Sequence, residues 1–238
     1  MSDRDADITF DRTIYWELSP EKKAMGAWVQ KRRLASAMRE VIGRLVESIA
    51  PEEELRTAAD ALERYAKQLA GHPRLKRYEG YAESATAGDV GAFFDQSPMI
   101  GLANPLAPPI RIEKTGERSA VGSVTFGAAY EGPPGSVHGG FVSAAFDEVL
   151  GYVQSLSGSP GFTGTLTTRY RSPMPLHTAL EFRCELNRQE GRKIFASGRA
   201  FAGDRLCAEA EAIFISARPE VFERLLAARK RMEAAREP

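Results

Sequence analysis

Residues 138–151 read His-Gly-Gly-Phe-Val-Ser-Ala-Ala-Phe-Asp-Glu-Val-Leu-Gly, and they are the most informative part of the sequence for the fold. After the two glycines the run is apolar on every side, which is typical of a helix that the rest of the protein encloses. Two carboxylates, Asp147 and Glu148, nevertheless stand in this apolar helix. Because burying an unpaired carboxylate is costly, a chain that keeps one there usually has a chemical use for it.

The beginning of the same helix offers hydrogen-bond donors. The first backbone N–H groups of a helix have no partner within it, and at Gly139 and Gly140 no side chain hinders the approach of a ligand. Such donors stabilise the negative oxygen that develops when a carbonyl group is attacked. The stretch therefore predicts an acid and an oxyanion site on one helix.

The residues that follow this helix alternate as strands do. Apolar and polar residues alternate over 180–186, and the pattern continues over 194–202 and 206–214. Before the helix, Val124, Phe126, Ala128 and Tyr130 alternate up to a Gly-Pro-Pro-Gly turn. One buried helix beside a run of turn-linked strands predicts an α+β fold in which an antiparallel sheet wraps around a central helix.

Two further helices are expected near the N-terminus. Apolar residues recur with helical spacing over 21–50, Pro51 interrupts the pattern, and a second amphipathic segment runs to Gly71. We therefore divide the chain into a tail with a helical hairpin, residues 1–85, and a main domain, residues 86–238. The hairpin is expected to pack on the main domain or on a second subunit. Prolines in 97–109 predict a structured loop, and 219–235 is expected to form an amphipathic C-terminal helix.

Composition excludes several classes of function. Lysine plus arginine and aspartate plus glutamate both number 32, so no net field attracts nucleic acid. The acidic N-terminus is unlike a signal peptide, and no apolar run approaches a membrane span, so we expect a cytoplasmic protein. Two cysteines without CxxC spacing and three scattered histidines favour neither a disulfide framework nor a metal site. The sequence contains no GxSxG elbow, which argues against a serine hydrolase, and no cofactor is expected.

Three blocks of the sequence resemble the hotdog-fold thioesterase superfamily, in particular the PaaI-like acyl-CoA thioesterases. They are the His-Gly-Gly helix at 138–151, Phe-Thr-Gly-Thr-Leu-Thr-Thr-Arg-Tyr-Arg-Ser-Pro at 162–173, and Glu-Gly-Arg-Lys at 190–193. The resemblance covers roughly residues 95–216. It implies the hotdog fold and a metal-free hydrolysis of an acyl-CoA thioester to a free acid and coenzyme A.

The resemblance also implies roles for individual residues. In the family the acid lies nine residues after the histidine, which is Asp147 here, and Thr163 matches a threonine that assists this acid or the attacking water. The site implied in this way contains Asp147, Gly139, His138, Thr163 and Gly140. His138 either fixes the turn or hydrogen-bonds near the thioester, and Glu148 is the rival carboxylate. Thr163 has the alternative of being an ordinary strand threonine.

Cationic residues are implied for the coenzyme A phosphates. Arg192 and Lys193 follow a turn glycine, where they would meet those phosphates, and Arg171 is a weaker candidate. Solvated surface charge is the alternative for all three.

The spacing within the helix argues for two chains in each site. Gly139 and Asp147 are eight residues apart, which at 1.5 Å per residue is about 12 Å along the axis. One carbonyl group must lie about 3 Å from both donor and acid, so the two should come from different copies of the helix. An isologous homodimer, or a dimer of dimers, supplies that pairing. Asp147 is then either a nucleophile or a general base toward water.

Two other functions fit the same pattern. A non-catalytic acyl-CoA-binding or ligand-sensing hotdog protein is the main alternative, and a hotdog hydratase is a third. Some ligand-responsive repressors pair a hotdog domain with an N-terminal DNA-binding module. Here the first 80 residues are nearly charge-balanced and include Glu52, Glu53 and Glu54, which disfavours contact with DNA. We therefore expect an acyl-CoA partner in lipid metabolism and no nucleic acid.

Overall fold

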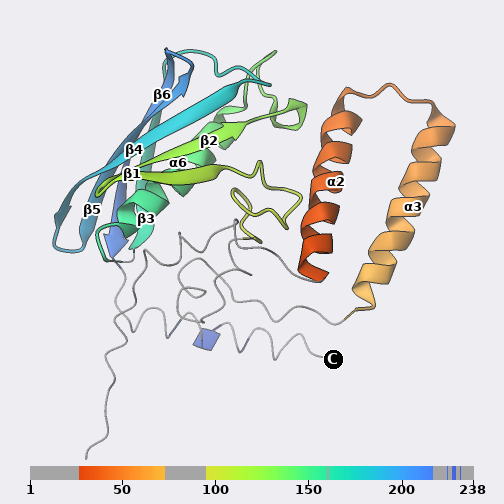
Figure 1. Ribbon diagram of the computed structural model, residues 1–238, viewed down its shortest axis with the longest axis horizontal. Coiled ribbons are helices and arrows are strands. Elements are labelled where there is room, and N and C mark those ends of the chain that lie inside the picture. Colours follow the sequence, from red (N-terminus) through yellow and green to blue (C-terminus); the bar gives the residue numbers. More distant parts are fainter. Residues whose placement is uncertain are drawn as a thin grey trace, which may run out of the picture.

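A six-stranded antiparallel sheet forms the body of the protein in the computed structural model (Figure 1). The structure describes residues 27–72, 95–159 and 161–216, together with four helical residues at 224, 227, 228 and 231. The strand order is β1-β2-β4-β5-β6-β3, so β3 and β1 lie at the two edges. The strands are β1 (Arg111–Gly116), β2 (Ser119–Thr125), β3 (Gly161–Tyr170), β4 (Ala179–Glu190), β5 (Lys193–Ala202) and β6 (Arg205–Ser216).

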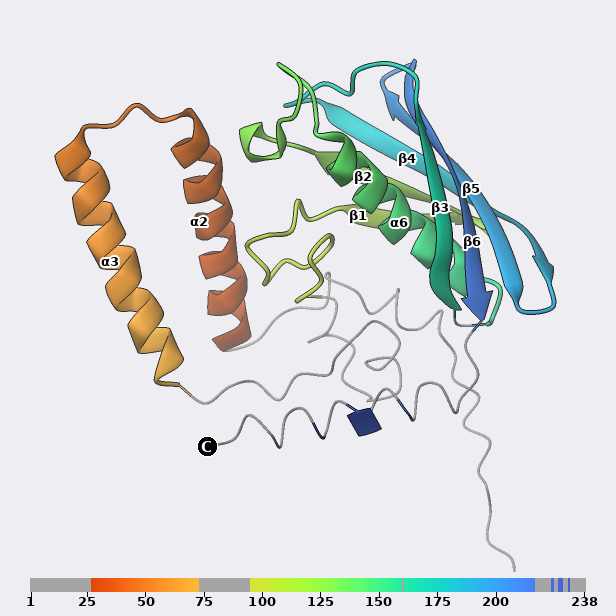
Figure 2. The ribbon, with the colours of Figure 1, turned by 180° about the vertical axis from the view of Figure 1, so that it is seen from behind.

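Helix α6 (Gly139–Ser155) packs across one face of this sheet, as Figure 2 shows. Its apolar side chains meet β2 to β6, and Phe146 contacts Phe182 of β4 edge to face with ring centroids 4.9 Å apart. The core continues along the sheet through Phe126 and Phe214, which are almost fully buried. An antiparallel sheet that wraps one central helix is the α+β hotdog arrangement, and that prediction is confirmed.

Two strand glycines allow α6 to lie close to the sheet. A Cβ atom at Gly122 of β2 would come within 2.4 Å of Val149, and one at Gly198 of β5 within 2.5 Å of the Cys184 sulfur and 3.3 Å of Phe146. Contacts this short do not occur between real side chains, so alanine at either position would push the helix or its neighbour outward. The glycines thus set the depth at which the helix sits.

The N-terminal helices lie to one side of the sheet (Figures 1 and 2). Helix α2 (Ala27–Glu47) contacts the short 3-10 turn η1 (Ala128–Tyr130), and its Arg39 donates to the carbonyl oxygens of Leu102 and Asn104. Helix α3 (Glu52–Ala70) has the bounds expected from Pro51 and Gly71 but buries none of its residues. Within one chain α2 packs on the main domain and α3 does not, so the packing of α3 on a second subunit stays a prediction.

Two details of the strand prediction were also wrong. The alternating segment that begins at Val124 leaves the sheet after Thr125, because residues 128–130 turn into η1. Strand β1 was not predicted, since it lies at an edge, its residues are mostly exposed, and apolar residues do not alternate in it. Cys184 and Cys207 are free and buried, as expected of packing residues.

Other predictions fall outside the described residues. These are the N-terminal tail, the boundary at residue 85 and most of the C-terminal segment, of which Arg224, Ala227, Ala228 and Arg231 are helical. Among the helices that are described, none is both long and apolar enough to cross a membrane.

Candidate active site

Polar side chains line the contact between α6 and the edge strand β3. Gly139, Ser143 and Asp147 are spaced by four residues, so they form one stripe along the helix. Alternate positions of β3 face this stripe with hydroxyl groups. We call this set the polar seam; it comprises Gly139, Ser143 and Asp147 of α6 and Thr163, Thr168 and Tyr170 of β3.

At one end of the polar seam Thr163 holds Asp147. The threonine Oγ1 donates to the Asp147 Oδ1 across 2.8 Å, and the β3–β6 register shifts between Thr163 and Thr165. Such a bulge re-aims the side chains next to it. No donor from the described residues approaches the other carboxylate oxygen, so this oxygen is available to a substrate or a water molecule.

Asp147 is exposed, which corrects the expectation that the whole helix is enclosed. The side chains of Phe146, Val149 and Leu150 are buried against the sheet, whereas the stripe with Asp147 runs beside the last strand. Beyond β3 no described strand covers it. One face of α6 therefore stays open in a single chain.

At the other end of the polar seam Tyr170 anchors the beginning of the helix. Its hydroxyl donates to the Gly139 carbonyl oxygen across 2.9 Å and lies 2.9 Å from Ser143 Oγ, which is 3.1 Å from Thr168 Oγ1. A Cβ at Gly139 would be only 3.1 Å from the Tyr170 hydroxyl. Sequence reasoning missed Ser143 and Tyr170, although the four-residue spacing from Gly139 to Asp147 and the alternation in β3 both indicate them.

The turn at His138, which precedes α6, leaves one backbone N–H group available. His138 caps α6, because its Nδ1 accepts the Gly140 N–H across 3.0 Å. Gly140 was predicted to offer a free donor, and this is wrong because the imidazole ring occupies that N–H group. The N–H of Gly139 has no acceptor in the described part of the chain. The geometry thus assigns a capping role to His138 and leaves the Gly139 N–H available to a ligand.

Glu148, the rival carboxylate, points away from the open face. Its Oε1 is buried and has no hydrogen-bond partner among the described residues. Burial, and then the charge of Asp147, raise the pKa of Glu148 to about 7, and the Ser97 hydroxyl acts in the opposite direction. A carboxyl group with such a pKa is largely protonated below neutral pH, which is a poor state for a nucleophile or base.

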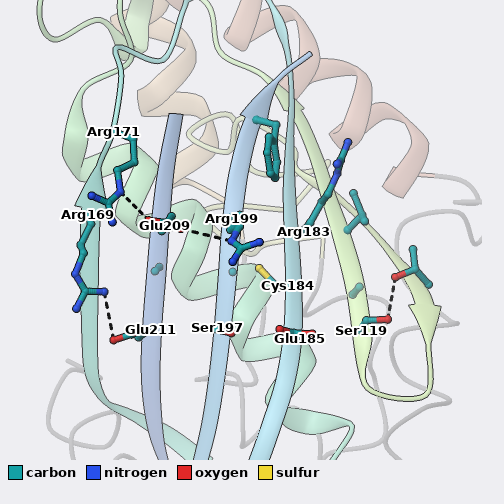
Figure 3. Close-up of a pocket in the computed structure, with 16 residues that line it drawn as sticks. Ser119, Arg169, Arg171, Arg183, Cys184, Glu185, Ser197, Arg199, Glu209 and Glu211 are labelled. Atoms are coloured by element: carbon teal, nitrogen blue, oxygen red, sulfur yellow. Dashed lines mark hydrogen bonds and ion pairs between the residues drawn. The ribbon is translucent and has the colours of Figure 1, made fainter. Parts of the chain in front are cut away.

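The predicted cationic residues lie at opposite ends of the sheet. Arg192 and Lys193 follow the β4–β5 turn, where the Arg192 Nε donates to the Ser216 carbonyl oxygen across 3.0 Å. Ser216 pairs with Gly161, so both cations lie near the Thr163 end of β3. Arg171 follows the other end of β3 and pairs with Glu209 at 2.7 Å on the outer face of the sheet (Figure 3). The structure does not bring Arg171 together with Asp147.

A mostly apolar cleft of about 410 Å³ opens next to Gly139. It is bounded by Val137, Val142 and Met174 together with Tyr170 and Pro173. The described residues contain no group of three or more His, Cys, Asp or Glu side chains that could hold a metal ion. The site therefore offers an acid, a backbone donor and an apolar surface.

Comparison with known proteins agrees with this arrangement. The family model of the thioesterase superfamily matches residues 134–213. A crystal structure of a thioesterase superfamily protein superimposes with a TM-score of 0.72 and 30% identity, covering 83% of this chain and 94% of that one. The chain belongs to the thioesterase superfamily.

Two relatives of this thioesterase superfamily protein carry more specific names. Acyl-coenzyme A thioesterase THEM4 of Mus musculus is 33% identical over 106 residues, which are 44% of this chain and 46% of the relative. Acyl-coenzyme A thioesterase THEM5 of Homo sapiens is 33% identical over 79 residues, 33% of this chain and 32% of the relative. The matches thus span less than half the length of these relatives.

Proposed function

We propose that this protein is an acyl-CoA thioesterase, which hydrolyses an acyl-CoA thioester to a carboxylic acid and coenzyme A. The observation that carries the proposal is the open carboxylate of Asp147, held at one oxygen by Thr163 and free at the other. Similarity to two acyl-coenzyme A thioesterases supports the substrate class.

The chemistry follows from the free oxygen of Asp147. As a nucleophile, it would form a bond to the thioester carbon, the carbon–sulfur bond would break, and water would then cleave the mixed anhydride. As a general base, it would take a proton from the water that attacks the same carbon. In both cases the Gly139 N–H stabilises the negative carbonyl oxygen, and the thiolate of coenzyme A leaves and takes up a proton.

Each site is proposed to form between two chains. Gly139 and Asp147 lie at opposite ends of the polar seam, about 12 Å apart along α6, which is too far for one carbonyl group. The exposed edge strand β3 and the exposed Asp147 lie on the same side of the molecule, where a second copy would have access. An antiparallel pair would place Gly139 of one chain opposite Asp147 of the other, twice.

Binding of the substrate is proposed to use two surfaces. The cleft beside Gly139 takes an apolar part of the substrate, because Val137, Val142 and Met174 line it. Arg192 and Lys193 are exposed at the end of the sheet nearer Thr163 and provide cations for the coenzyme A phosphates. Catalysis is proposed to need no cofactor, so a metal chelator should leave turnover unchanged.

A panel of acyl-CoA esters of different chain length and ring content, assayed for release of free thiol, tests the proposal. Hydrolysis of at least one ester, lost in Asp147→Asn, is the expected result. Tight binding of one ester without hydrolysis would instead favour a ligand-sensing protein. A cytoplasmic, PaaI-like enzyme of lipid metabolism stays our expectation, and fractionation of cells would test the location.

A further inference from the structure

Tyr170, at the end of β3, makes polar contacts to which the reaction proposed above assigns no role. Its side chain is exposed, yet its hydroxyl group donates to the Gly139 carbonyl oxygen across 2.9 Å. The same hydroxyl oxygen lies 2.9 Å from the Ser143 Oγ. A phenylalanine would cover the same apolar surface without these contacts. The hydroxyl group of Tyr170 therefore acts on the beginning of α6, and packing of the ring does not explain it.

The backbone at Gly139 depends on its surroundings for a fixed shape, because glycine has the least restricted backbone of all residues. The helix holds the peptide group before Gly139, since the His138 carbonyl oxygen accepts the N–H groups of Phe141 and Val142 across 2.9 and 3.3 Å. The other polar end of this peptide group is the Gly139 N–H, the proposed oxyanion donor. Its direction is fixed only if the peptide group after Gly139 is held as well.

The peptide group after Gly139 is held at both of its polar ends. Its carbonyl oxygen belongs to Gly139 and accepts the Tyr170 hydroxyl group across 2.9 Å. Its N–H belongs to Gly140 and donates to the His138 Nδ1 across 3.0 Å. His138 is part of the turn itself, whereas Tyr170 belongs to a strand. The tyrosine therefore ties this peptide group to the sheet.

The two residues are also matched in size. A Cβ atom at Gly139 would lie 3.1 Å from the Tyr170 hydroxyl oxygen and 3.2 Å from its Cζ. Contacts this short are tighter than nearly all real Cβ contacts, so glycine lets the tyrosine approach without displacement. Tyr170 also borders the apolar cleft beside Gly139. One side chain thus contacts both the proposed substrate cleft and the residue that carries the proposed donor.

Ser143 supports the tyrosine from one turn further along α6. Its Oγ lies 2.9 Å from the Tyr170 hydroxyl oxygen and 3.1 Å from the Thr168 Oγ1. Thr168 and Tyr170 are alternate residues of β3, which runs beside α6 (Figure 2), so they lie on the same side of the strand. Linked hydrogen bonds polarise and strengthen one another. Ser143 therefore helps to fix the position of the Tyr170 hydroxyl group.

We propose that Tyr170 is a positioning residue for the Gly139 N–H. Its hydroxyl group, held by Ser143, fixes the peptide group after Gly139 and so directs the N–H before it toward the carbonyl oxygen of a bound thioester. This inference rests on the proposed function, in which that N–H stabilises the negative oxygen. Because such a donor acts mainly in the transition state, a small change in its direction lowers kcat and hardly affects KM.

Steady-state kinetics of Tyr170→Phe, on an acyl-CoA that the wild type hydrolyses, tests the proposal. The ring that borders the cleft remains, so KM should change by about twofold or less, whereas kcat should fall roughly tenfold. Tyr130→Phe is the matched control, because it also removes a tyrosine hydroxyl group that donates to a backbone carbonyl oxygen, that of Leu106. An unchanged kcat in Tyr170→Phe, or an equal loss in Tyr130→Phe, would overturn the proposal.

The contribution of Ser143 is tested by a double-mutant cycle. Ser143→Ala alone should lower kcat about threefold, whereas in the Tyr170→Phe background the same change should have almost no effect, because the serine acts through the tyrosine hydroxyl group. Losses that simply add would show that Ser143 does not act through Tyr170, and the supporting role given to the serine would then be wrong.

Amide hydrogen exchange, measured by NMR on the full chain, does not depend on activity. Release of the Gly139 carbonyl group should loosen the turn. The Gly140 N–H should then exchange roughly tenfold faster in Tyr170→Phe than in the wild type or in Tyr130→Phe. If Tyr170→Phe leaves this exchange unchanged, the proposal is wrong even for an active enzyme. If no acyl-CoA ester is hydrolysed, the proposed function fails, and the exchange result alone decides whether Tyr170 holds the turn.

Discussion

The polar seam and the outer face of the sheet are both open and polar, but they differ in the partners that their acidic side chains have. The outer face carries a groove of about 710 Å³, larger than the cleft of about 410 Å³ beside Gly139. Figure 3 shows that arginines and glutamates alternate across this groove: Arg169 pairs with Glu211 at 3.3 Å, and both Arg171 and Arg199 approach Glu209. The polar seam instead holds one acid by a neutral hydroxyl group.

The difference shows that cavity size is a poor guide to chemistry in this protein. The hydrogen bond from Arg171, and the charges of three arginines, lower the pKa of Glu209, so that this acid is a weak base and its charge is already compensated. Asp147 has no cationic partner in the described chain, and a carboxylate with uncompensated charge is free to attack or to take a proton. We therefore propose that catalysis uses the smaller, less charged region.

The largest difference between the two regions is expected when an acid of each is replaced. Asp147→Asn keeps the shape of the side chain and removes its charge, so kcat should fall roughly a hundred- to ten-thousandfold with little change in KM. Glu211→Gln, in the outer groove, should leave kcat within about twofold, because exposed ion pairs contribute little. Steady-state kinetics on one hydrolysed acyl-CoA measures both. Normal turnover in Asp147→Asn would refute the mechanism, and if Glu148→Gln then abolished turnover, Glu148 would be the acid.

The second prediction uses the contrast between enclosed and solvated acids. Glu148 has a pKa of about 7 in the folded protein against an ordinary value of 4.5, so the unfolded chain loses this proton first. Folded-state stability should therefore fall as pH rises from about 4.5 to about 7, by about 3 kcal/mol, and Glu148→Gln should not show this loss. Urea unfolding at pH 4.5 and pH 8 measures it. Exposed Glu185→Gln serves as the control, and a wild-type fall that persists in Glu148→Gln would mean that another group is responsible.

The third prediction concerns the two ends of the polar seam. Gly139→Pro removes the backbone donor, and proline is tolerated at the first position of a helix, although Tyr170 must yield slightly. This variant and Asp147→Asn should each be inactive as homodimers. After subunit exchange at equal amounts, about a quarter of wild-type activity should return, since half of the dimers are mixed and each mixed dimer has one intact site. Recovery of no activity despite proven exchange would place donor and acid in one chain.

The smallest effect is expected at the cationic end of the sheet. Replacing Arg192 and Lys193 together by alanine should raise KM for acyl-CoA about tenfold, because charge-assisted contacts to phosphate are lost. A pantetheine thioester that lacks the nucleotide should show almost no change. Arg169→Ala, on the outer face, is the matched control for loss of a surface charge. Equal KM changes for the two substrates would show that Arg192 and Lys193 do not contact the coenzyme A phosphates.

Much of the architecture is determined by sequence patterns that depend only on neighbouring residues. The apolar run after His138 and the alternation over 180–214 predicted a helix wrapped by a sheet, since side chains repeat every 3.6 residues in helices and every two in strands. The candidate acid and the Gly139 donor followed from the same stretch and from family resemblance. The turn at Pro51 predicted the start of α3 for an equally local reason.

Only the tertiary structure shows which face of a helix or strand is covered by its neighbours. Local pattern places Asp147 and Glu148 in the same apolar helix, but only the position of β3 at the sheet edge leaves Asp147 open, whereas one carboxylate oxygen of Glu148 is buried. Two hydrogen bonds of the site also depend on tertiary structure or on local turn geometry. The His138 imidazole accepts the Gly140 N–H, and the Tyr170 hydroxyl donates to the Gly139 carbonyl oxygen. Two adjacent acids thus differ in exposure, which the linear pattern does not show, and this difference separates the proposed catalytic acid from its neighbour.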